Sequence, residues 1–503
     1  MPRLGSTAAR REESDRVYTP ERLDRDGASS RASRRRRRRT PARQTWAAVG
    51  LAAVSTLLPG SGHIWAGRRR SGIAILAFFL LLAGGGVLLA TVVDPTQLLV
   101  YAVDTNVLTA VMVTAVLLAI GWSAVIVSAY HLRRPGQSSV LHGLLAALVV
   151  GVLSFAVSTP PIYAARQAYV GRDVISNVFN DDDKQPRKSK EGKDPWADKP
   201  RLNVLLLGGD GGRNRTGVRT DTMIVASIDT RTGDTVMFSL PRNMLNAPMP
   251  DRMKDEFPSG YTDMLNAVYV YGTDNPNKFK KGSNPGAQAT QEVISEILGL
   301  KIDYYALVNL KAFEEIIDAI GGITVYVEKD LPIGPEGAYV GYVRKGKRHL
   351  NGKKALWYAR SRAADDDYHR MQRQRCVMAA IAKQADPATV MRSFQKIAAT
   401  TKKNVKTDIP NDDLPALLQL GKKAKSAEIS SLPLIPPLVD TGNPDYPQIK
   451  AEVQETIRKA EKRSEKKRAK KPSDDKGKAK KPKTSKTGKP GKPNSVEAAC
   501  GLD

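Results

Sequence analysis

The 503-residue sequence is poor in the residues from which zinc, thiol and nucleotide sites are built. It has two cysteines and five histidines, and none of them forms a CxxC pair or an HExxH motif. Zinc and thiol-redox chemistry therefore have no support. The run GGDGG at 208–212 lacks both the Lys-Ser/Thr pair of a P-loop and the spacing of a dinucleotide fingerprint, so we expect no nucleotide there.

The two cysteines, Cys376 and Cys500, lie far apart in the sequence. Cys500 follows a stretch rich in Lys, Pro and Gly, a composition typical of disorder. Because a disulfide needs a defined geometry between its two partners, the sequence disfavours a bridge between them.

Positive charge dominates the sequence, with a net charge of +28, but most of it lies in the two tails. Residues 1–44 carry 14 Arg against 6 acidic residues (+8), and residues 458–492 carry 17 Lys or Arg against 4 acidic residues (+13). We interpret 1–44 as a disordered basic cytoplasmic tail, and 451–503 as a Lys-rich, mostly disordered tail that begins with a charged helix. The middle of the chain is only mildly basic, and the topology predicted below places the second tail outside the cell, so no nucleic-acid partner is expected. The second tail either associates with anionic wall polymer or lipid headgroups or is simply solvated.

Four apolar segments form a predicted membrane region at 45–165, without a cleavable signal peptide. They lie at about 46–66, 72–93, 106–130 and 141–164. The last three match the roughly 20 residues that cross a bilayer. If 46–66 also crossed, the arginines at 68–70 would lie outside, against the positive-inside rule, whereas a re-entrant 46–66 obeys it. We therefore expect a multi-pass protein of the cell membrane with a re-entrant or, alternatively, a spanning first segment, and a linker at 166–200 that leads to an extracellular domain.

Residues 201–450 form the predicted domain, in which apolar strand-like runs alternate with helical patterns. Strands are expected at 203–207, 222–228, 235–240, 304–310 and 323–327. A hairpin turn is expected at 229–234, where Gly233 allows a positive φ. Helices are expected around 293–298 and 313–320, each closed by glycine. This alternation indicates an α/β domain whose buried sheet is covered by helices.

Arginine and aspartate residues collect at the ends of these apolar runs. The candidate site residues are Asp210, Asp221, Arg219, Arg242, Arg360, Arg362, Arg370, Arg373 and Gln374. Arg360 and Arg362 are two residues apart, so an extended backbone would place both on one side of the chain. Arg370, Arg373 and Gln374 instead repeat at i, i+3 and i+4, which places them on one face of a helix.

These side chains suit phosphate chemistry. Guanidinium groups bind phosphate oxygens in a bidentate manner and stay charged, so several arginines from separate segments favour a pyrophosphate. Paired aspartates such as Asp210 and Asp221, without histidine or cysteine, suit a hard ion such as Mg²⁺ or Mn²⁺. Together they predict metal-assisted phosphoryl transfer, in which positioning and electrostatics dominate.

The sequence resembles the LytR-CpsA-Psr family, membrane-anchored enzymes that attach glycopolymers to bacterial peptidoglycan. The matching motifs, in the family's order, are NVLLLGGD (203–210), RTDTMIV (219–225), SLPRN (239–243), LNAVYVYG (265–272), IDYYALVNLKAF (302–313), IDAIGGITVYV (317–327), LNGKKALWYARSR (350–362) and DYHRMQRQ (367–374). The resemblance implies an α-β-α layered domain with a mixed central sheet. It also implies a transferase that moves a polymer from a polyprenyl-pyrophosphate carrier to a sugar hydroxyl of peptidoglycan, forming a phosphodiester.

The resemblance further implies roles for individual residues. It assigns Asp210 and Asp221 to the divalent metal, Arg219, Arg242, Arg360 and Arg362 to the pyrophosphate, and Arg370 and Gln374 to the lining of the same pocket. Arg373 joins the substrate-binding set through its place on the same helical face. One position departs from the family pattern, because Asn243 follows Arg242 where the family usually has Asp. Asparagine keeps an acceptor oxygen but has no charge, so we expect no charge-based role there.

Two other functions would use the same residues. A non-catalytic scaffold or regulator would bind lipid-linked polymer through the arginines, without needing the aspartates for turnover. A polyprenyl-pyrophosphate hydrolase would use water in place of the sugar hydroxyl.

Overall fold

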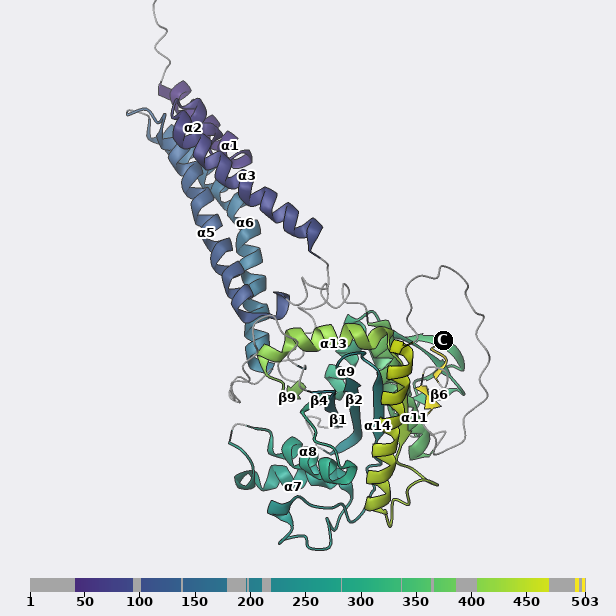
Figure 1. Cartoon of the computed structure of the whole chain (residues 1–503). Helices are drawn as coiled ribbons and strands as arrows, with labels where there is room; N and C mark the ends of the chain where they lie inside the picture. The colour runs from purple at the N-terminus through teal and green to yellow at the C-terminus, as the bar shows by residue number, and fades with distance from the viewer. Residues whose placement is uncertain are drawn as a thin grey trace, which may run out of the picture.

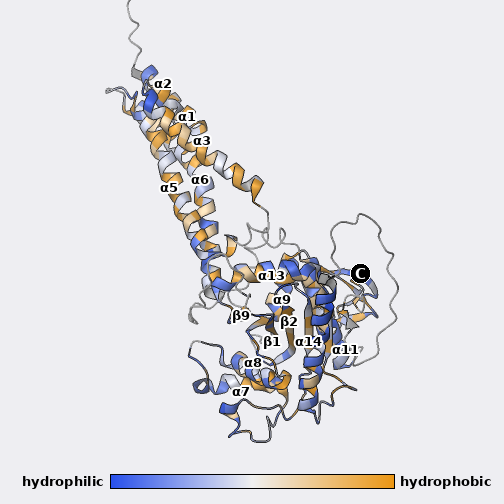
Figure 2. Cartoon of the chain, viewed as in Figure 1, coloured by the Kyte–Doolittle hydropathy of each residue, from blue (hydrophilic) through white to orange (hydrophobic). Residues whose placement is uncertain are grey.

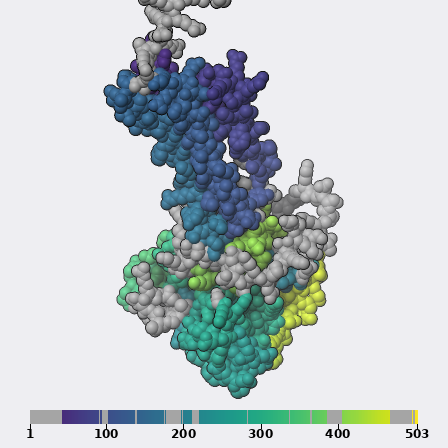
Figure 3. Space-filling model, turned by 90° about the vertical axis from the view of Figure 1, so that its left-hand side faces the viewer, coloured from purple at the N-terminus to yellow at the C-terminus, as the bar shows by residue number. Residues whose placement is uncertain are grey.

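The computed structural model describes residues 41–93, 101–136, 139–178, 196, 199–209, 219–281, 283–335, 337–362, 366–385, 405–469, 494–496 and 500–502. The predicted N-terminal tail up to residue 40 and the Lys-rich stretch 470–493 lie outside these ranges. The described residues form an apolar helix bundle and a layered α/β domain (Figure 1). Apolar residues cover the bundle helices along most of their length (Figure 2), and the space-filling view shows the bundle standing on the domain (Figure 3).

The bundle contains the expected apolar helices. It consists of α1 (Pro41–Leu57), α2 (Ser61–Trp65), α3 (Arg69–Val92), α5 (Thr105–His131) and α6 (Val140–Val178). Among the described residues, three helical stretches are long and apolar enough to cross a membrane, at Arg69–Leu89, Thr105–His131 and Val140–Asp173. They match the three predicted spans. Because α6 continues to Val178, the predicted linker does not begin at residue 166.

The first predicted apolar segment, 46–66, is broken into a helical hairpin. The chain turns at Gly60, whose φ is 93°. A Cβ atom on Gly60 would come within 2.4 Å of the carbonyl oxygen of Gly72 in α3, so only glycine fits this close approach. After the turn, α2 packs against α5, where His63 Nε2 and Ser128 Oγ are hydrogen-bonded at 3.1 Å. The interruption in the sequence thus produces two short helices, and the choice between a re-entrant and a spanning segment stays a prediction.

In the described part of the chain, a seven-stranded mixed sheet with strand order β11-β10-β3-β2-β1-β4-β9 forms the centre of the domain. The strands are β1 (Arg201–Gly209), β2 (Thr220–Asp229), β3 (Thr235–Ser239), β4 (Tyr304–Asn309), β9 (Val405–Thr407), β10 (Ile429–Pro433) and β11 (Asn494–Ser495). The pairs β1–β4 and β3–β10 are parallel, and the other pairs are antiparallel. The predicted turn between β2 and β3 is confirmed, since Gly233 has a φ of 81°.

Helices cover both faces of the sheet (Figure 1). One layer holds α7 (Val268–Asp274), α8 (Pro285–Leu298) and α14 (Tyr446–Ala469), and the other holds α9 (Leu310–Ala319), α10 (Gly352–Arg360), α11 (Asp367–Gln384) and α13 (Leu414–Ser426). Each layer packs on the sheet around its own hydrophobic core, the first core under α7, α8 and α14 and the second under α9, α10 and α11. Side chains alternate between the two faces along a strand, so Met223 and Val225 of β2 belong to the first core and Ile224 to the second. The predicted α-β-α architecture with a mixed sheet is confirmed.

A β ribbon connects α9 with α10. It is made of two strand pairs in series, β5 (Ile323–Val327) with β8 (Gly346–Leu350) and β6 (Leu331–Ile333) with β7 (Gly341–Val343). Its buried side, which includes Val325 and Val343, joins the core under α10 and α11. Short 3-10 helices lie at η1 (Asp251–Met253), η2 (Leu265–Ala267), η3 (Pro276–Lys278) and η4 (Asn411–Asp413).

The C-terminal part of the chain departs from the prediction. The expected charged helix is present as α14, but it buries Ile449 and Val453 in the first core, so the domain does not end at residue 450. Farther along, β11 extends the sheet beside β10. Cys500 forms a disulfide with Cys376 of α11, with Cα atoms 5.3 Å apart, so the prediction against a bridge is wrong. Composition could not reveal it, because the pairing depends on the chain returning to the sheet after the Lys-rich stretch.

Candidate functional site

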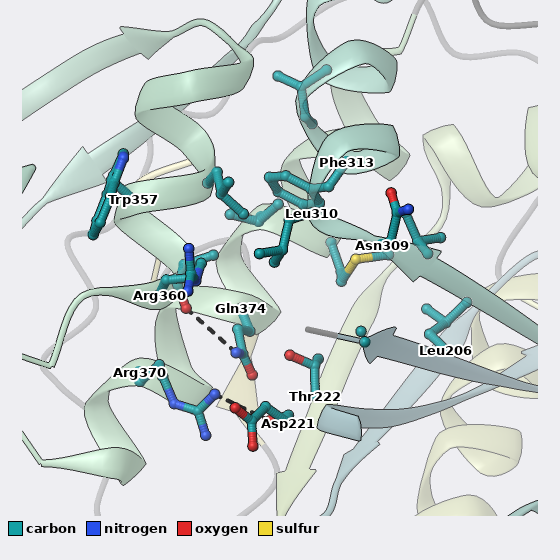
Figure 4. A pocket seen from close by; sticks show the side chains of 18 of the residues that line it. Leu206, Asp221, Thr222, Asn309, Leu310, Phe313, Trp357, Arg360, Arg370 and Gln374 are labelled. Carbon is teal, nitrogen blue, oxygen red and sulfur yellow. Dashed lines mark hydrogen bonds between the residues drawn. The ribbon is translucent and has the colours of Figure 1, made fainter. Parts of the chain in front are cut away.

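A cavity of about 710 Å³ lies between the sheet and the helices α9, α10 and α11 (Figure 4). Its walls are mainly apolar: Leu206, Ile224 and Val308 line the sheet side, and Phe313 of α9 and Val377 of α11 line the helix side. The volume lies within the usual range for pockets that hold small ligands. A group of charged side chains closes one end, so the cavity has an apolar part and a polar part.

Asp221 and Arg370 lie at the polar end of the cavity (Figure 4). The backbone oxygen of Asp221, near the start of β2, accepts a hydrogen bond from Arg370 Nη1 at 3.1 Å. Its carboxylate Oδ1 accepts a hydrogen bond from Arg242 Nη1 at 3.0 Å. Burial raises the pKa of Asp221, but the hydrogen bond and charge of Arg242, with the charges of Arg370 and Arg362, outweigh burial and hold the pKa below its ordinary value. Asp221 is therefore ionised at neutral pH.

A second carboxylate, Asp367, joins this group at the first residue of α11. Its Oδ1 and Oδ2 accept hydrogen bonds from Arg370 Nε (3.1 Å) and Nη2 (2.8 Å), a bidentate pair. Arg362 Nε lies 3.3 Å and Arg242 Nε 3.7 Å from the same Oδ1. Asp367 was not among the predicted site residues, although it lies in the DYHRMQRQ motif. Its i, i+3 spacing to Arg370 at the start of a helix is the signal that could have identified it.

Arg242 and Arg362 reach the aspartates from two other segments. Arg242 follows β3, and its carbonyl accepts a hydrogen bond from Asn266 N at 3.2 Å, while Asn266 Nδ2 lies 3.4 Å from Asp221 Oδ1. Arg362 Nη2 lies 3.6 Å from Asp221 Oδ2. Burial lowers the pKa of Arg362, and the charges of the neighbouring arginines lower it further, against the opposing effect of the two aspartates. Arginines this close to one another repel, so a bound anion would stabilise the group.

Arg360 belongs to a helix and not to an extended segment. The prediction that an extended backbone aims Arg360 and Arg362 to one side is wrong, because α10 continues through Arg360. The exposed guanidinium of Arg360 lies 5.5 Å from the centre of the Trp357 ring, a cation–π arrangement. Both arginines nevertheless line the cavity.

The predicted helix at 367–374 is confirmed as α11, but its polar side chains separate. Arg370 and Gln374 line the cavity, and Gln374 Nε2 lies 3.4 Å from a backbone oxygen of α10 (Figure 4). Arg373 is buried, and it donates hydrogen bonds to the carbonyl oxygens of Tyr358 (2.8 Å) and Ser361. Contrary to the prediction, Arg373 does not line this cavity but holds the end of α10, where Arg360 lies, and the segment that leads on to Arg362.

Two predicted site residues stay predictions. Asp210 lies outside the described residues. Arg219 is the residue before β2; its side chain is exposed and is not part of the cavity lining.

The carboxylates of the site suit a hard divalent cation. Within the described residues, no group of three or more His, Cys, Asp or Glu side chains comes together. Asp221 and Asp367 nevertheless both contact the guanidinium of Arg242: Asp221 Oδ1 lies 3.0 Å from Nη1, and Asp367 Oδ1 lies 3.7 Å from Nε. Mg²⁺ commonly takes only one or two carboxylates and completes its shell with water and substrate phosphate. An ionised Asp221 with a second aspartate nearby fits that pattern.

Asn243, the position that departs from the family pattern, has a contact outside the charged group. Its Nδ2 donates a hydrogen bond to Thr441 Oγ1 at 3.2 Å, which joins the segment after β3 to the segment that leads to α14. Asn243 thus has a structural contact between two segments of the chain.

Three comparisons relate the chain to known proteins. It is 32% identical over 246 residues to biofilm regulatory protein A of Streptococcus mutans, covering 47% of this chain and 57% of that protein. It is 32% identical over 232 residues to the polyisoprenyl-teichoic acid–peptidoglycan teichoic acid transferase TagU of Enterococcus faecalis, covering 45% of this chain and 68% of that protein. The crystal structure of TagV of Bacillus subtilis is 26% identical and matches 52% of this chain and 97% of its own, with a TM-score of 0.40. The family model of the LytR_cpsA_psr family matches residues 169–463, more than half of the sequence, and the chain belongs to this family.

Proposed function

We propose that this protein is a membrane-anchored phosphotransferase that moves a glycopolymer from a polyprenyl-pyrophosphate carrier to a sugar hydroxyl of peptidoglycan. One observation carries the proposal: the apolar walls of a single cavity lead to a group of arginines. The proposed donor has the same two parts, a long apolar chain and a charged head. The name of the TagU relative, a teichoic acid transferase that acts on peptidoglycan, supports the same class of reaction.

The charge of the site matches that of a pyrophosphate. Among the described residues, the site contains four arginines (Arg242, Arg360, Arg362 and Arg370) and two aspartates (Asp221 and Asp367), so their formal charge is +2. A pyrophosphate diester carries two negative charges and offers oxygens that guanidinium groups bind in a bidentate manner. The aspartates hold the arginines in place before the donor arrives, so little reorganisation is needed when charge develops.

In the proposed reaction, the oxygen of the acceptor hydroxyl attacks the phosphorus that carries the glycopolymer. A phosphorus–oxygen bond to the acceptor forms, the bond from that phosphorus to the bridging oxygen breaks, polyprenyl phosphate leaves, and the proton of the hydroxyl passes to solvent water. Negative charge grows on the leaving phosphate, where Arg362 and Arg370 would stabilise it. A bound Mg²⁺ or Mn²⁺ would add further charge neutralisation, held by Asp221 with Asp210 or Asp367.

We also propose that the domain lies outside the cell on a multi-pass anchor. The basic clusters 68–70 and 133–134 support this topology, because Arg133 Nη2 donates a hydrogen bond to the carbonyl oxygen of Trp65 at 2.9 Å. Both clusters therefore lie at one end of the bundle, beside α2, and the domain lies at the other end (Figure 1). A basic end in the cytoplasm obeys the positive-inside rule and places the domain on the outer side. The same topology fits a re-entrant α1–α2 hairpin.

A transfer assay with the full-length protein tests the proposed function. The protein in lipid nanodiscs would be mixed with a lipid-linked polymer donor, peptidoglycan and Mg²⁺, and polymer attached to peptidoglycan and polyprenyl phosphate would be measured. We expect both products, no attached polymer without peptidoglycan, and no turnover by Arg362→Ala. Equal release of free polymer phosphate with and without peptidoglycan would identify a hydrolase instead. Donor binding without any product would identify a scaffold.

A further inference from the structure

The β ribbon between α9 and α10 has an exposed apolar tip that the proposed transfer reaction does not use. Tyr339 is 40%, Val340 77% and Tyr342 45% exposed. The tip is ordered by a hydrogen bond from Val340 N to the oxygen of Ile333 at 2.7 Å, and by Gly334 with a φ of 122°. Tyr339 and Val340 lie in the loop between β6 and β7, Tyr342 lies in β7, and all three are exposed to solvent. Exposed apolar groups that gather in one patch mark an interaction site.

Basic residues flank the tip. The ribbon at 323–350 carries five Lys or Arg and three acidic residues, a net charge of +2, and four of the basic residues follow the tip directly in the stretch 344–348. The guanidinium of Arg344 lies 5.0 Å from the centre of the Tyr342 ring and 2.7 Å from Asp330. Tyrosine beside Lys and Arg is the composition of segments at membrane interfaces, where the ring lies at headgroup level and the cation binds anionic headgroups.

The same turn borders the substrate cavity. Gly334 and Pro335 line the cavity together with Trp357 and Arg360 of α10. In Figure 1 the ribbon, labelled at β6, lies nearer to the level of the helix bundle than α7 and α8 do. A surface that contacts the tip would therefore also lie close to the edge of the cavity.

We propose that the ribbon tip, defined as residues 334–335 and 337–342, docks on the anionic phospholipid surface of the membrane that anchors the chain. This inference rests on the proposed function, because the docked tip would bring the cavity edge to the lipid from which a polyprenyl chain enters. Moving that chain through water would expose methylene groups at a high free-energy cost, and contact between cavity edge and bilayer avoids the exposure. The three apolar helices keep the domain near the surface, so even a weak contact is well populated.

Fluorescence quenching tests the contact without relying on turnover. The full-length Val340→Trp variant would be placed in nanodiscs that contain a headgroup-region doxyl phospholipid, in phosphatidylglycerol or in phosphatidylcholine. A Lys254→Trp variant is the matched control, because Lys254 is an exposed residue (side chain 61% exposed) next to η1 in the other layer of the domain. The fluorescence of the parental protein would be subtracted from that of each variant. In phosphatidylglycerol nanodiscs we expect the Trp at position 340 to be quenched at least about twofold more than the Trp at position 254. High salt should reduce the quenching at position 340. Equal quenching at the two positions would overturn the proposal.

A comparison of two donors tests the consequence. Val340→Asp places a negative charge on the tip, and Lys254→Asp is its control. We expect Val340→Asp to slow transfer from a long-chain polyprenyl donor in phosphatidylglycerol nanodiscs by about tenfold, and transfer from a short-chain water-soluble donor by less than about twofold. Equal losses with both donors would mean that the tip binds the sugar polymer, and no loss with either would mean that docking is irrelevant; both results overturn the proposal. If the parent protein transfers neither donor, the proposed function fails, while the quenching experiment still decides the contact.

Discussion

Arg370 binds the carboxylate of Asp367 with two nitrogens, at 3.1 and 2.8 Å, and uses its third to bind the backbone oxygen of Asp221 at 3.1 Å. Its side chain is only 4% exposed. One buried guanidinium thus joins the first turn of α11 to the start of β2. Because arginine stays charged at every physiological pH, this link fixes the position of both aspartates and of the arginines that pair with them.

Neutralising Asp221 or Asp367 should reduce the rate of transfer far more than it reduces the stability of the fold. Asp367→Asn and Asp221→Asn keep the side-chain shape but remove the charge that orders the arginines, so we expect kcat/KM to fall by about 100-fold or more. The unfolding midpoint should change little for Asp221→Asn, because that side chain is partly exposed (28%). Asp367→Asn should lower the midpoint as well, because the nearly buried Arg370 (4% exposed) loses its ionised partner. The transfer assay and a urea titration measure the two effects. Transfer by Asp367→Asn at the parental rate would contradict a role for this residue.

Replacing Arg360 should weaken donor binding, whereas replacing Arg373 should weaken the fold. Arg360 is exposed, so Arg360→Ala should leave stability within about 0.5 kcal/mol and weaken donor binding about tenfold or more. Arg373→Ala removes a buried guanidinium that holds two carbonyl oxygens, so it should lower the free energy of unfolding by about 2–4 kcal/mol. Donor titration and thermal unfolding of both variants check the contrast. The reverse pattern would restore Arg373 as a substrate-binding residue.

The disulfide should stabilise the domain strongly. It closes a loop of 124 residues between Cys376 and Cys500, for which chain-entropy arguments give about 4–5 kcal/mol. We expect Cys500→Ser, or reduction of the parent protein, to lower the free energy of unfolding by an amount of this order. Because Cys376 follows Gln374 closely on α11, activity should fall as well. The comparison is a urea titration with and without reductant, in which the Cys500→Ser variant should be insensitive to the reductant.

Filling the apolar end of the cavity should discriminate between donors by chain length. Ile316 of α9 lines the cavity and is half-buried, so Ile316→Trp would occupy space that a prenyl chain needs. We expect KM for a long-chain donor to rise about tenfold while a short-chain donor is affected less. Lys311→Trp, on the exposed side of the same helix, is the control. Equal effects on the two donors would show that the chain binds elsewhere.

Asp408 should make stability depend on pH near 6. Burial raises the pKa of Asp408 to about 6 from an ordinary 3.8, against the opposing hydrogen bond from Tyr305 N. Between these values the native carboxyl binds a proton that the unfolded one does not, so stability falls as pH rises through this window. Asp408→Asn should therefore raise the free energy of unfolding at pH 8 by up to about 3 kcal/mol and change it little at pH 4. Urea titrations at both pH values, with the exposed Asp412→Asn as control, test the sign.

Local patterns predicted most elements of the fold. The strands at β1 to β5, the hairpin at Gly233 and the helices α8, α9 and α11 follow from apolar periodicity and glycine positions, which depend only on neighbouring residues. Helix bounds were less predictable. α10 continues through Arg360 although ARSR alone also fits an extended segment, because its apolar face packs on the ribbon and α11.

Hydropathy and residue patterns along the chain are enough to show that apolar helices precede an α/β domain and that arginines and aspartates gather at the ends of its strands and helices. How these charged residues are used depends on packing between elements. Asp367 enters the charged group because α11 begins next to β2, and Arg373 leaves it because its guanidinium finds the carbonyl oxygens at the end of α10. Cys500 meets Cys376 because β11 returns to the sheet edge. Each of these contacts joins residues from two different elements, so it depends on how those elements pack. The periodicity of residues within one element carries no information about that packing.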